Sequence, residues 1–204
     1  MNNQENFSLL LLAGGRGERL GGQDKGLLTL QGKTFVARLL ERFAPLARAV
    51  LISANRHLDV YQGIAAPWHA TVLPDTNHGF HGPLAGILTG LQHAQTDWVL
   101  VLPCDAQHLP EDLIEKLRTP CEQNQAQAVF AVVDEQAQPL VCFLRRSLVK
   151  TLEQDFAAGE RSVVRWLRSI NAQRSEFDSN TAHCWSINTP DDLARVASQS
   201  CFIC

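Results

Sequence analysis

The residues best suited to chemistry lie near the start of the sequence, in the stretch Leu9 to Leu28, LLLLAGGRGERLGGQDKGLL. An apolar run passes directly into glycines that are interspersed with three basic residues, Arg16, Arg19 and Lys25. Glycines permit a close approach of the backbone, and the amides exposed in such a loop bind phosphate oxygens. The compact charge of Lys25 suits the same oxygens. The loop is therefore predicted to hold a phosphate-bearing ligand.

The spacing of the glycines excludes two common phosphate loops. The pattern Gly-x-Gly-x-x-Gly, started at Gly15 and Gly17, would need a glycine at position 20, which is Leu20. A Walker loop that ends in the Gly-Lys-Thr of positions 32–34 would need a glycine at position 27, which is Leu27. Neither pattern fits. A purely structural glycine-rich turn is the remaining alternative, but it does not explain the basic residues.

Two aspartates follow other apolar segments. Asp105 comes after the run Trp98–Leu102, and Asp75 comes after Thr71–Leu73. Mg²⁺ usually takes one or two carboxylates together with phosphate oxygens and water, so Asp105 is the predicted metal ligand. A turn or a helix cap is the alternative role for Asp105, and a Pro-Asp turn is the alternative for Asp75.

These residues need a scaffold, and the pattern of apolar residues predicts one. Apolar runs of strand length alternate with segments of helical period, which is typical of a mostly parallel sheet with helices on both faces. We therefore expect a Rossmann-like three-layer α/β/α sandwich. The expected strands are Phe7–Leu12, Ala49–Ser53, Thr71–Leu73, Trp98–Leu102, Ala128–Val133, Leu140–Leu144 and His183–Ile187; the expected helices are Thr34–Phe43, Pro83–His93, Pro110–Leu117, Ser147–Phe156, Ser162–Ile170 and one that begins near Thr189.

Ligands of open α/β sheets bind beyond the carboxyl ends of the strands. This rule points to the loop after Leu12, the Pro-Asp after Leu73 and the Pro-Cys-Asp after Leu102. We expect these three loops to lie at one edge of the sheet.

Composition limits the class of protein. The 204 residues carry a net charge of −3, so a general affinity for nucleic acid or for an anionic membrane is not expected. The start of the chain has no basic region of a signal peptide, and the expected location is cytoplasmic. One domain is predicted over residues 1–204, with a tail at 199–204. Six cysteines are expected to be reduced thiols, although the terminal Cys-x-x-Cys leaves a metal or redox role open: Cys104, Cys121, Cys142, Cys184, Cys201 and Cys204.

The glycine loop resembles a known signature. LAGGRGERL at 12–20, with Lys25 shortly after, is similar to the signature of nucleotidyltransferases, which move a nucleoside monophosphate from a nucleotide onto an acceptor. The order of further stretches is that of the molybdenum cofactor guanylyltransferases, from about Leu9 to Leu193. These stretches are GGQDKGLLTLQGK, SANRH, PDTNHGFHGPLAGI, LPCDAQHLP, AGERSV and INTPDDL.

The resemblance implies that GMP is transferred from GTP to the phosphate of molybdopterin, with Mg²⁺ as cofactor and pyrophosphate as second product. It implies further partners in the apoenzymes that receive the product, or their chaperones. Residues 7–110 would hold GTP and metal, and residues 126–195 would face molybdopterin. The implied catalytic residues are Arg19, Lys25 and Asp105; the implied GTP-binding residues are Leu12, Ala13, Gly14, Gly15, Lys25, Ser53, Asn55, Asp75 and Asp105.

The resemblance also assigns an acceptor side. Arg161 would grip the phosphate of the pterin, and Asn188 would face the acceptor; helix capping and a helix start are the respective alternatives. The sequence departs from the family at Ser53 and Ser186, where asparagine is usual. Serine keeps a hydroxyl but lacks the paired donor and acceptor of an amide, so base reading at Ser53 is the affected function.

Two rival functions remain open. One is another transferase on the same scaffold, specific for a cytidine nucleotide or for a sugar-1-phosphate acceptor. The other is a module that binds GTP without turnover. Lys25 and Asp105 favour an enzyme, because a module that only binds GTP need not keep a carboxylate for the metal.

Overall fold

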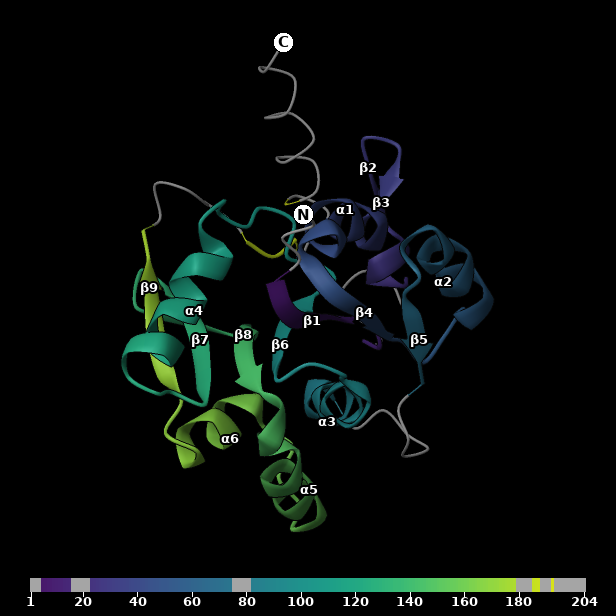
Figure 1. The fold of residues 1–204 in the computed structure, drawn as a ribbon. Coiled ribbons are helices and arrows are strands. Elements are labelled where there is room, and N and C mark those ends of the chain that lie inside the picture. The colour runs from purple at the N-terminus through teal and green to yellow at the C-terminus, as the bar shows by residue number, and fades with distance from the viewer. Residues whose placement is uncertain (1–4, 16–22, 75–81, 179–184, 188–191, 193–204) are drawn as a thin grey trace.

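The centre of the structure is a seven-stranded sheet in the order β5-β4-β1-β6-β8-β7-β9 (Figure 1). The structure is a computed structural model, and it describes residues 5–15, 23–74, 82–178, 185–187 and 192. A two-stranded sheet of β2 and β3 lies beside the main one. The strands are β1 Glu5–Leu12, β2 Thr29–Leu30, β3 Lys33–Thr34, β4 Ala47–Ser53, β5 Thr71–Leu73, β6 Trp98–Pro103, β7 Ala128–Val133, β8 Gln136–Arg145 and β9 Gln173–Phe177.

The direction of the strands confirms a mostly parallel sheet. β1 pairs in parallel with β4 on one side and β6 on the other, and β4 pairs in parallel with β5. β8 is antiparallel to both of its neighbours, β6 and β7, while β7 and β9 are parallel. The residues of β1 are buried on both faces from Phe7 to Leu12, as expected for a central strand.

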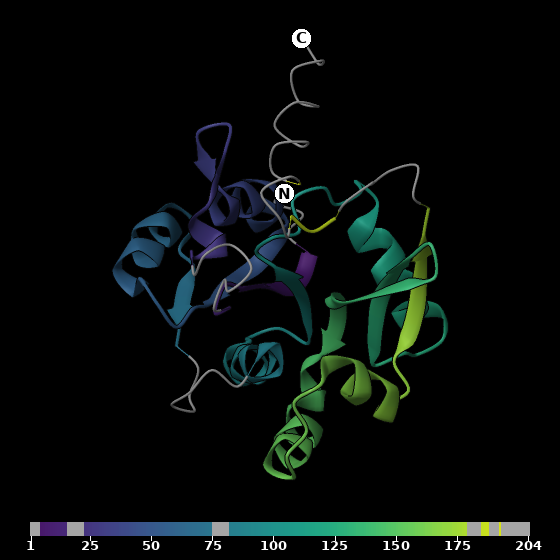
Figure 2. The same ribbon diagram turned by 180° about the vertical axis from the view of Figure 1, so that it is seen from behind.

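Helices cover both faces of this sheet (Figures 1 and 2). The side chains of α1, α2 and α4 pack in one hydrophobic core, and those of α3, α5 and α6 pack in a second core on the opposite face. The three-layer α/β/α sandwich is therefore confirmed. The helices are α1 Phe35–Phe43, α2 Leu58–Ala65, α3 Pro83–His93, α4 Leu113–Gln123, α5 Val149–Ala157 and α6 Val163–Ser169; short 3-10 turns are η2 Lys25–Leu27, η3 Ala44–Leu46, η4 Ala66–Trp68 and η5 Arg146–Leu148.

The start of α4 corrects a prediction. The helix begins at Leu113, not at Pro110, and it continues through Pro120 to Gln123. The guanidinium of Arg42 on α1 donates to the carbonyls of Leu109 (2.6 Å) and Pro110 (2.7 Å). The Pro110 carbonyl also accepts from the amide of Leu113 at 3.4 Å. Residues 109 and 110 are therefore held by α1 in a turn that precedes the helix.

Several other elements differ from the prediction. Helix α2, strand β9 and the small β2–β3 sheet were not predicted. The helices expected to start at Thr34 and Ser162 begin one residue later, and the side chains of these two residues cap them through hydrogen bonds. Of the late strand expected at His183–Ile187, the structure describes only residues 185–187. There Ser186 forms a single bridge to Ala106. The helix expected near Thr189 lies outside the described residues.

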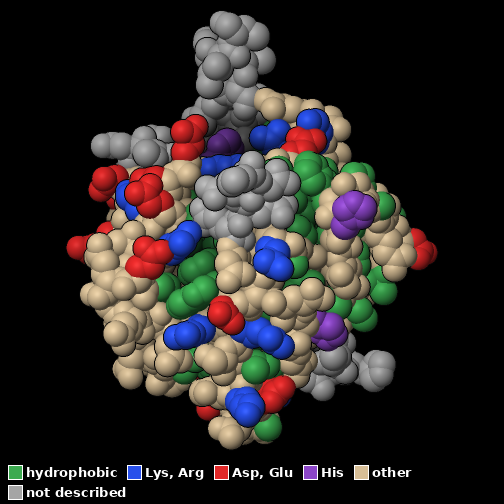
Figure 3. Space-filling model, viewed as in Figure 1, with side chains coloured by type: hydrophobic (Ala, Val, Ile, Leu, Met, Phe, Trp, Pro, Cys, Tyr) green, Lys and Arg blue, Asp and Glu red, His purple; other side chains and the backbone are tan. Residues whose placement is uncertain are grey.

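The described cysteines are buried free thiols: Cys104, Cys121 and Cys142. Burial raises the pKa of Cys121 to about 11, and it raises the pKa of the other two further, so all three are protonated at neutral pH. Cys184, Cys201 and Cys204 lie outside the described residues. On the face shown in Figure 3, basic and acidic side chains are interspersed and do not form one basic patch. Within the described part of the chain, no helix is long and apolar enough to span a bilayer.

We expect Gly90→Ala to destabilise the fold. A Cβ at Gly90 would overlap the side chain of Leu10, which is fully buried in β1. Overpacking of this kind costs about 1–3 kcal/mol, which exceeds the gain in helix propensity of about 0.5–1 kcal/mol. Urea unfolding measures the change. Gly63→Ala on α2 is the matched control, because nothing lies within 4 Å of its added Cβ. If Gly90→Ala proved as stable as Gly63→Ala, this close packing would be contradicted.

Candidate functional site

Four loops are tied together at the carboxyl ends of the central strands, the edge seen in Figure 2. The amide of Ala13 donates to the carbonyl of Ser53 (2.7 Å), and the amide of Ala54 donates to the carbonyl of Leu73 (3.0 Å). The amide of Cys104 donates to the carbonyl of Leu12 (3.0 Å). The segments that follow β1, β4, β5 and β6 therefore begin at one edge of the sheet, which includes the three loops predicted to lie there.

Lys25 and Asp105 meet at this edge, although 80 positions separate them in the chain. The ammonium Nζ of Lys25 donates to Oδ2 of Asp105 at 2.8 Å. Both side chains are largely shielded, with exposed fractions of 20% and 14%. Lys25 belongs to the turn η2 at the end of the glycine-rich segment, and Asp105 belongs to the turn after β6. The structure thus joins the predicted phosphate-binding lysine to the predicted metal ligand.

The turn that carries Asp105 is fixed by contacts that the sequence did not predict. The side chain of Gln107 donates to the carbonyls of Cys104 (2.8 Å) and Phe35 (3.2 Å). The amide of Ile187 donates to the carbonyl of Asp105 at 3.0 Å. Ile187 is itself fully buried. A segment 82 positions along the chain therefore holds the backbone of Asp105 in place.

Asp105 fits a metal site in which the protein supplies few of the ligands. Among the described residues, no three His, Cys, Asp or Glu side chains gather in a way that could enclose an ion. One hard carboxylate oxygen is what Mg²⁺ takes from a protein when phosphate oxygens and water supply its other ligands. The carboxylate of Asp105 suits such a shared magnesium site.

Ser53 and Asn55 lie against the start of the glycine loop. A Cβ at Gly14 would lie 2.9 Å from Nδ2 of Asn55 and 4.0 Å from Oγ of Ser53. A Cβ at Gly86, on α3, would lie 2.7 Å from the same Ser53 hydroxyl. Ser53 is 2% exposed. The two residues implied to recognise the nucleotide base are therefore brought together beside the loop.

Arg56 contacts the glycine loop, and the sequence analysis did not predict this contact. Its guanidinium Nη2 donates to the carbonyl of Gly15 at 2.9 Å, which connects the segments that follow β4 and β1. The stretch SANRH contains Arg56 and was the signal that could have identified it. This hydrogen bond positions the last described residue before the basic part of the loop.

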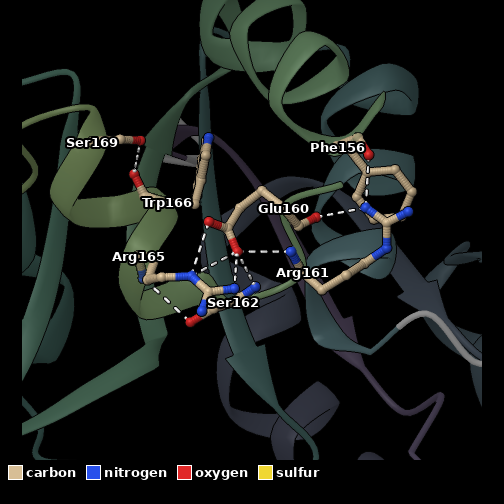
Figure 4. Close-up of polar contacts among 7 residues, drawn as sticks. All are labelled: Phe156, Glu160, Arg161, Ser162, Arg165, Trp166 and Ser169. Carbon is tan, nitrogen blue, oxygen red and sulfur yellow. Dashed lines mark hydrogen bonds and ion pairs between the residues drawn. The ribbon is translucent and has the colours of Figure 1, made fainter. Parts of the chain in front are cut away.

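The structure places Arg161 at the end of α5, where it caps the helix (Figure 4). Its Nη1 donates to the carbonyls of Phe156 (2.6 Å) and Glu160 (2.7 Å). The guanidinium lies over the Phe156 ring, 3.8 Å from its centroid. Gly159, with φ of 98°, ends the helix as expected. The capping alternative is therefore observed, and contact of Arg161 with a ligand stays a prediction.

The neighbouring Glu160 gives the molecule a small acid sensitivity. Hydrogen bonds from the Arg165 side chain and from the amides of Ser162 and Arg161 lower the pKa of Glu160 from 4.5 to about 2 (Figure 4). A lowered pKa means that the carboxylate stabilises the fold above pH 4.5 and loses this contribution as the pH falls toward 2.

We therefore expect Glu160→Gln to melt slightly below the parent at about pH 6, because the exposed pair contributes little. At about pH 3 the two melting temperatures should be closer. Thermal unfolding followed by circular dichroism measures both. An unchanged difference at the two pH values would contradict the assignment.

Several predicted site residues lie outside the described residues: Arg16, Arg19, Asp75 and Asn188. The described ones form two groups. Leu12, Ala13, Gly14, Gly15, Lys25, Ser53, Asn55 and Asp105 belong to the carboxyl edge of β1, β4 and β6, whereas Arg161 belongs to the end of α5.

Comparison with known proteins gives a consistent result. A curated protein of Yersinia pseudotuberculosis, named molybdenum cofactor guanylyltransferase, is 40% identical over 189 residues, which cover 93% of this chain and 94% of that protein. A solved structure of a molybdopterin-guanine dinucleotide biosynthesis protein A from Archaeoglobus fulgidus aligns with a TM-score of 0.76 at 26% identity, covering 95% of this chain and 98% of that one.

A more distant structure shows the fold alone. The 4-diphosphocytidyl-2C-methyl-D-erythritol synthase of Anaerococcus prevotii aligns with a TM-score of 0.70 at 11% identity, covering 95% of this chain and 97% of that one. The family model of the MobA-like NTP transferase domain matches residues 9–175. The chain therefore belongs to the family of MobA-like NTP transferase domains.

Proposed function

We propose that the chain transfers GMP from GTP to the phosphate of molybdopterin, giving the guanine dinucleotide form of the cofactor and pyrophosphate. The observation that carries this proposal is the pairing of Lys25 with Asp105 at 2.8 Å. It joins the glycine loop, which suits a triphosphate, to the carboxylate that suits Mg²⁺. The name of the Yersinia relative supports the choice of GTP and of the molybdenum cofactor as substrates.

The reaction asks for positioning and for charge neutralisation. An oxygen of the acceptor phosphate forms a bond to the α-phosphorus of GTP, while the bond from that phosphorus to the bridging oxygen breaks and pyrophosphate leaves with the electron pair. The acceptor oxygen is already anionic, so no protein nucleophile is needed. The ammonium of Lys25 binds a phosphate oxygen and offsets its charge. Mg²⁺, held by Asp105, would supply further neutralisation when it is bound.

The two substrates would contact different groups of residues. Gly14 and Gly15 offer backbone amides to phosphate oxygens, and Ser53 with Asn55 would contact the base. Arg19 would bind the leaving pyrophosphate, and Asp75 would contact the nucleotide. Arg161 and Asn188 are assigned to the pterin side, with Arg161 acting from its position at the end of α5. Transfer of the product to apoenzymes or their chaperones would follow.

The test is pyrophosphate release from GTP, CTP, ATP and UTP in the presence of Mg²⁺, each with and without molybdopterin or its molybdate-loaded form. Release with GTP alone, and only with the pterin present, is the expected result. Release with CTP would move the chain to a cytidylyl specificity on the same fold. Binding of GTP without turnover by any pterin form would overturn the proposal and favour a nucleotide-binding module.

A further inference from the structure

The hydroxyl of Tyr61 contacts both residues that flank Lys25. On one side it donates to Oδ1 of Asp24 at 2.6 Å. On the other side it lies against Gly26, where an added Cβ would overlap this hydroxyl and would lie 3.0 Å from the side chain of Val36. Tyr61 comes from the middle of α2, 36 positions beyond Lys25. One hydroxyl therefore borders the turn η2 before and after the lysine.

The same carboxylate also orders the turn itself. Oδ1 of Asp24 accepts a hydrogen bond from the amide of Gly26 at 3.2 Å, so Asp24 is the N-cap of η2. This arrangement fixes the backbone on both sides of Lys25. A lysine side chain is long and flexible, and a fixed backbone narrows the volume that its ammonium can reach.

The hydrogen bond between Tyr61 and Asp24 is shielded from water. Tyr61 is fully buried and Asp24 is 8% exposed. Burial, followed by the hydrogen bond to Asp24, raises the pKa of Tyr61 well above its ordinary value of 10.0, so the hydroxyl remains a donor at any working pH. Hydrogen bonds to a carboxylate are short and strong, and loss of the Tyr61 hydroxyl would remove one of the two hydrogen bonds that Oδ1 of Asp24 accepts.

We propose that Asp24 and Tyr61 form a positioning pair, which holds Lys25 at the distance from Asp105 that triphosphate binding requires. The inference rests on the proposed role of Lys25 toward GTP. Neither member of the pair is proposed to touch the substrate. Both act through the backbone of η2, and helix α2 thereby supports the active site from the core.

The test is a cycle of four proteins: the parent, Tyr61→Phe, Lys25→Met and the double variant. Tyr61→Phe removes only the hydroxyl, so the packing of α2 is kept. We expect it to raise the dissociation constant of GTP with Mg²⁺ about fivefold when Lys25 is present, and by less than about twofold in the Lys25→Met background. The rate of pyrophosphate release from the single variant should fall about tenfold.

A structural effect would give a different pattern. Ser8→Ala is the matched control, because it also removes a buried hydroxyl, which is 2.7 Å from Oγ1 of Thr96 near the amino end of β1. It should lower the melting temperature and leave GTP binding unchanged. Equal losses from Tyr61→Phe in both backgrounds, or no loss at all, would overturn the positioning pair. If Lys25→Met itself leaves GTP binding intact, the proposed role of Lys25 fails instead.

A second series tests the acceptor. Asp24→Asn keeps an oxygen that can accept from Tyr61 and from the amide of Gly26, whereas Asp24→Ala keeps none. The asparagine variant should therefore retain most of the GTP affinity that the alanine variant loses. Equal affinities of the two variants would contradict the hydrogen-bonding role.

Discussion

Asp105→Asn is expected to lower the rate of pyrophosphate release from GTP at least about a hundredfold, the scale seen when one charge-stabilising group is removed from an active site. Asparagine has the same shape, but its neutral amide forms no ion pair with the Lys25 ammonium and offers Mg²⁺ no carboxylate. The fold should survive, because Ile187 and Gln107 hold this turn through backbone carbonyls that the substitution leaves in place. Steady-state assays and thermal melts measure the two quantities.

Asp112→Asn is the matched control for this prediction. Asp112 forms an ion pair with Lys116 at 3.1 Å, and its side chain is 45% exposed at the start of α4. Loss of such a surface pair changes stability by less than about 1 kcal/mol and should not change turnover. Full activity of Asp105→Asn beside a fully active Asp112→Asn would remove Asp105 from the proposed metal site.

The apolar pattern was sufficient to predict the central part of the fold. Strands β1, β4 and β6 contain the buried apolar runs Leu9–Leu12, Val50–Ile52 and Val99–Leu102, which can be recognised without knowledge of their neighbours. Parallel strands place their carboxyl ends at one edge, and this rule predicted that the loop after Leu12 and the Pro-Cys-Asp after Leu102 would lie there. The 2.8 Å contact between Lys25 and Asp105 is a finding of the structure, and the rule did not predict it.

The missed elements share a physical cause. Strand β9, of sequence QRSEF, pairs with a single neighbour at the edge of the sheet, so only two of its five side chains are buried. Helix α2 likewise buries only Tyr61 and Ala65. Such elements are stabilised by tertiary pairing, and their own residues carry a weak periodic signal. In α4 the burial of Leu117 and Cys121 outweighs the local effect of Pro120.

The contacts that refine the candidate site were beyond sequence reasoning for a different reason. Gln107 reaches Phe35, and Tyr61 reaches Asp24, across separations of 72 and 37 positions. Glutamine and tyrosine are common residues, and nothing in their spacing distinguishes a support of the active site from an ordinary buried side chain. Only the packing of α1 and α2 against the sheet determines these pairs.

Lys25→Met is expected to lower kcat/KM for GTP about a hundredfold. Methionine keeps much of the length and the apolar stem of lysine but has no charge, so the variant isolates the contribution of the ammonium to phosphate binding. The effect should combine with that of Asp105→Asn to less than the product of the two, because the two side chains are in direct contact and serve one ligand. Steady-state kinetics of the single and double variants test both statements.

Lys33→Met is the matched control for Lys25→Met. Lys33 also pairs with a carboxylate at 2.8 Å, that of Glu41, but the exposed fractions of the two side chains are 54% and 44%. Water screens that pair, whereas Lys25 and Asp105 are shielded, so the same bond length corresponds to different energies. Lys33→Met should leave kcat/KM unchanged. Equal losses in the two variants would mean that general positive charge attracts GTP, and that the enclosed position of Lys25 beside Asp105 is not what matters.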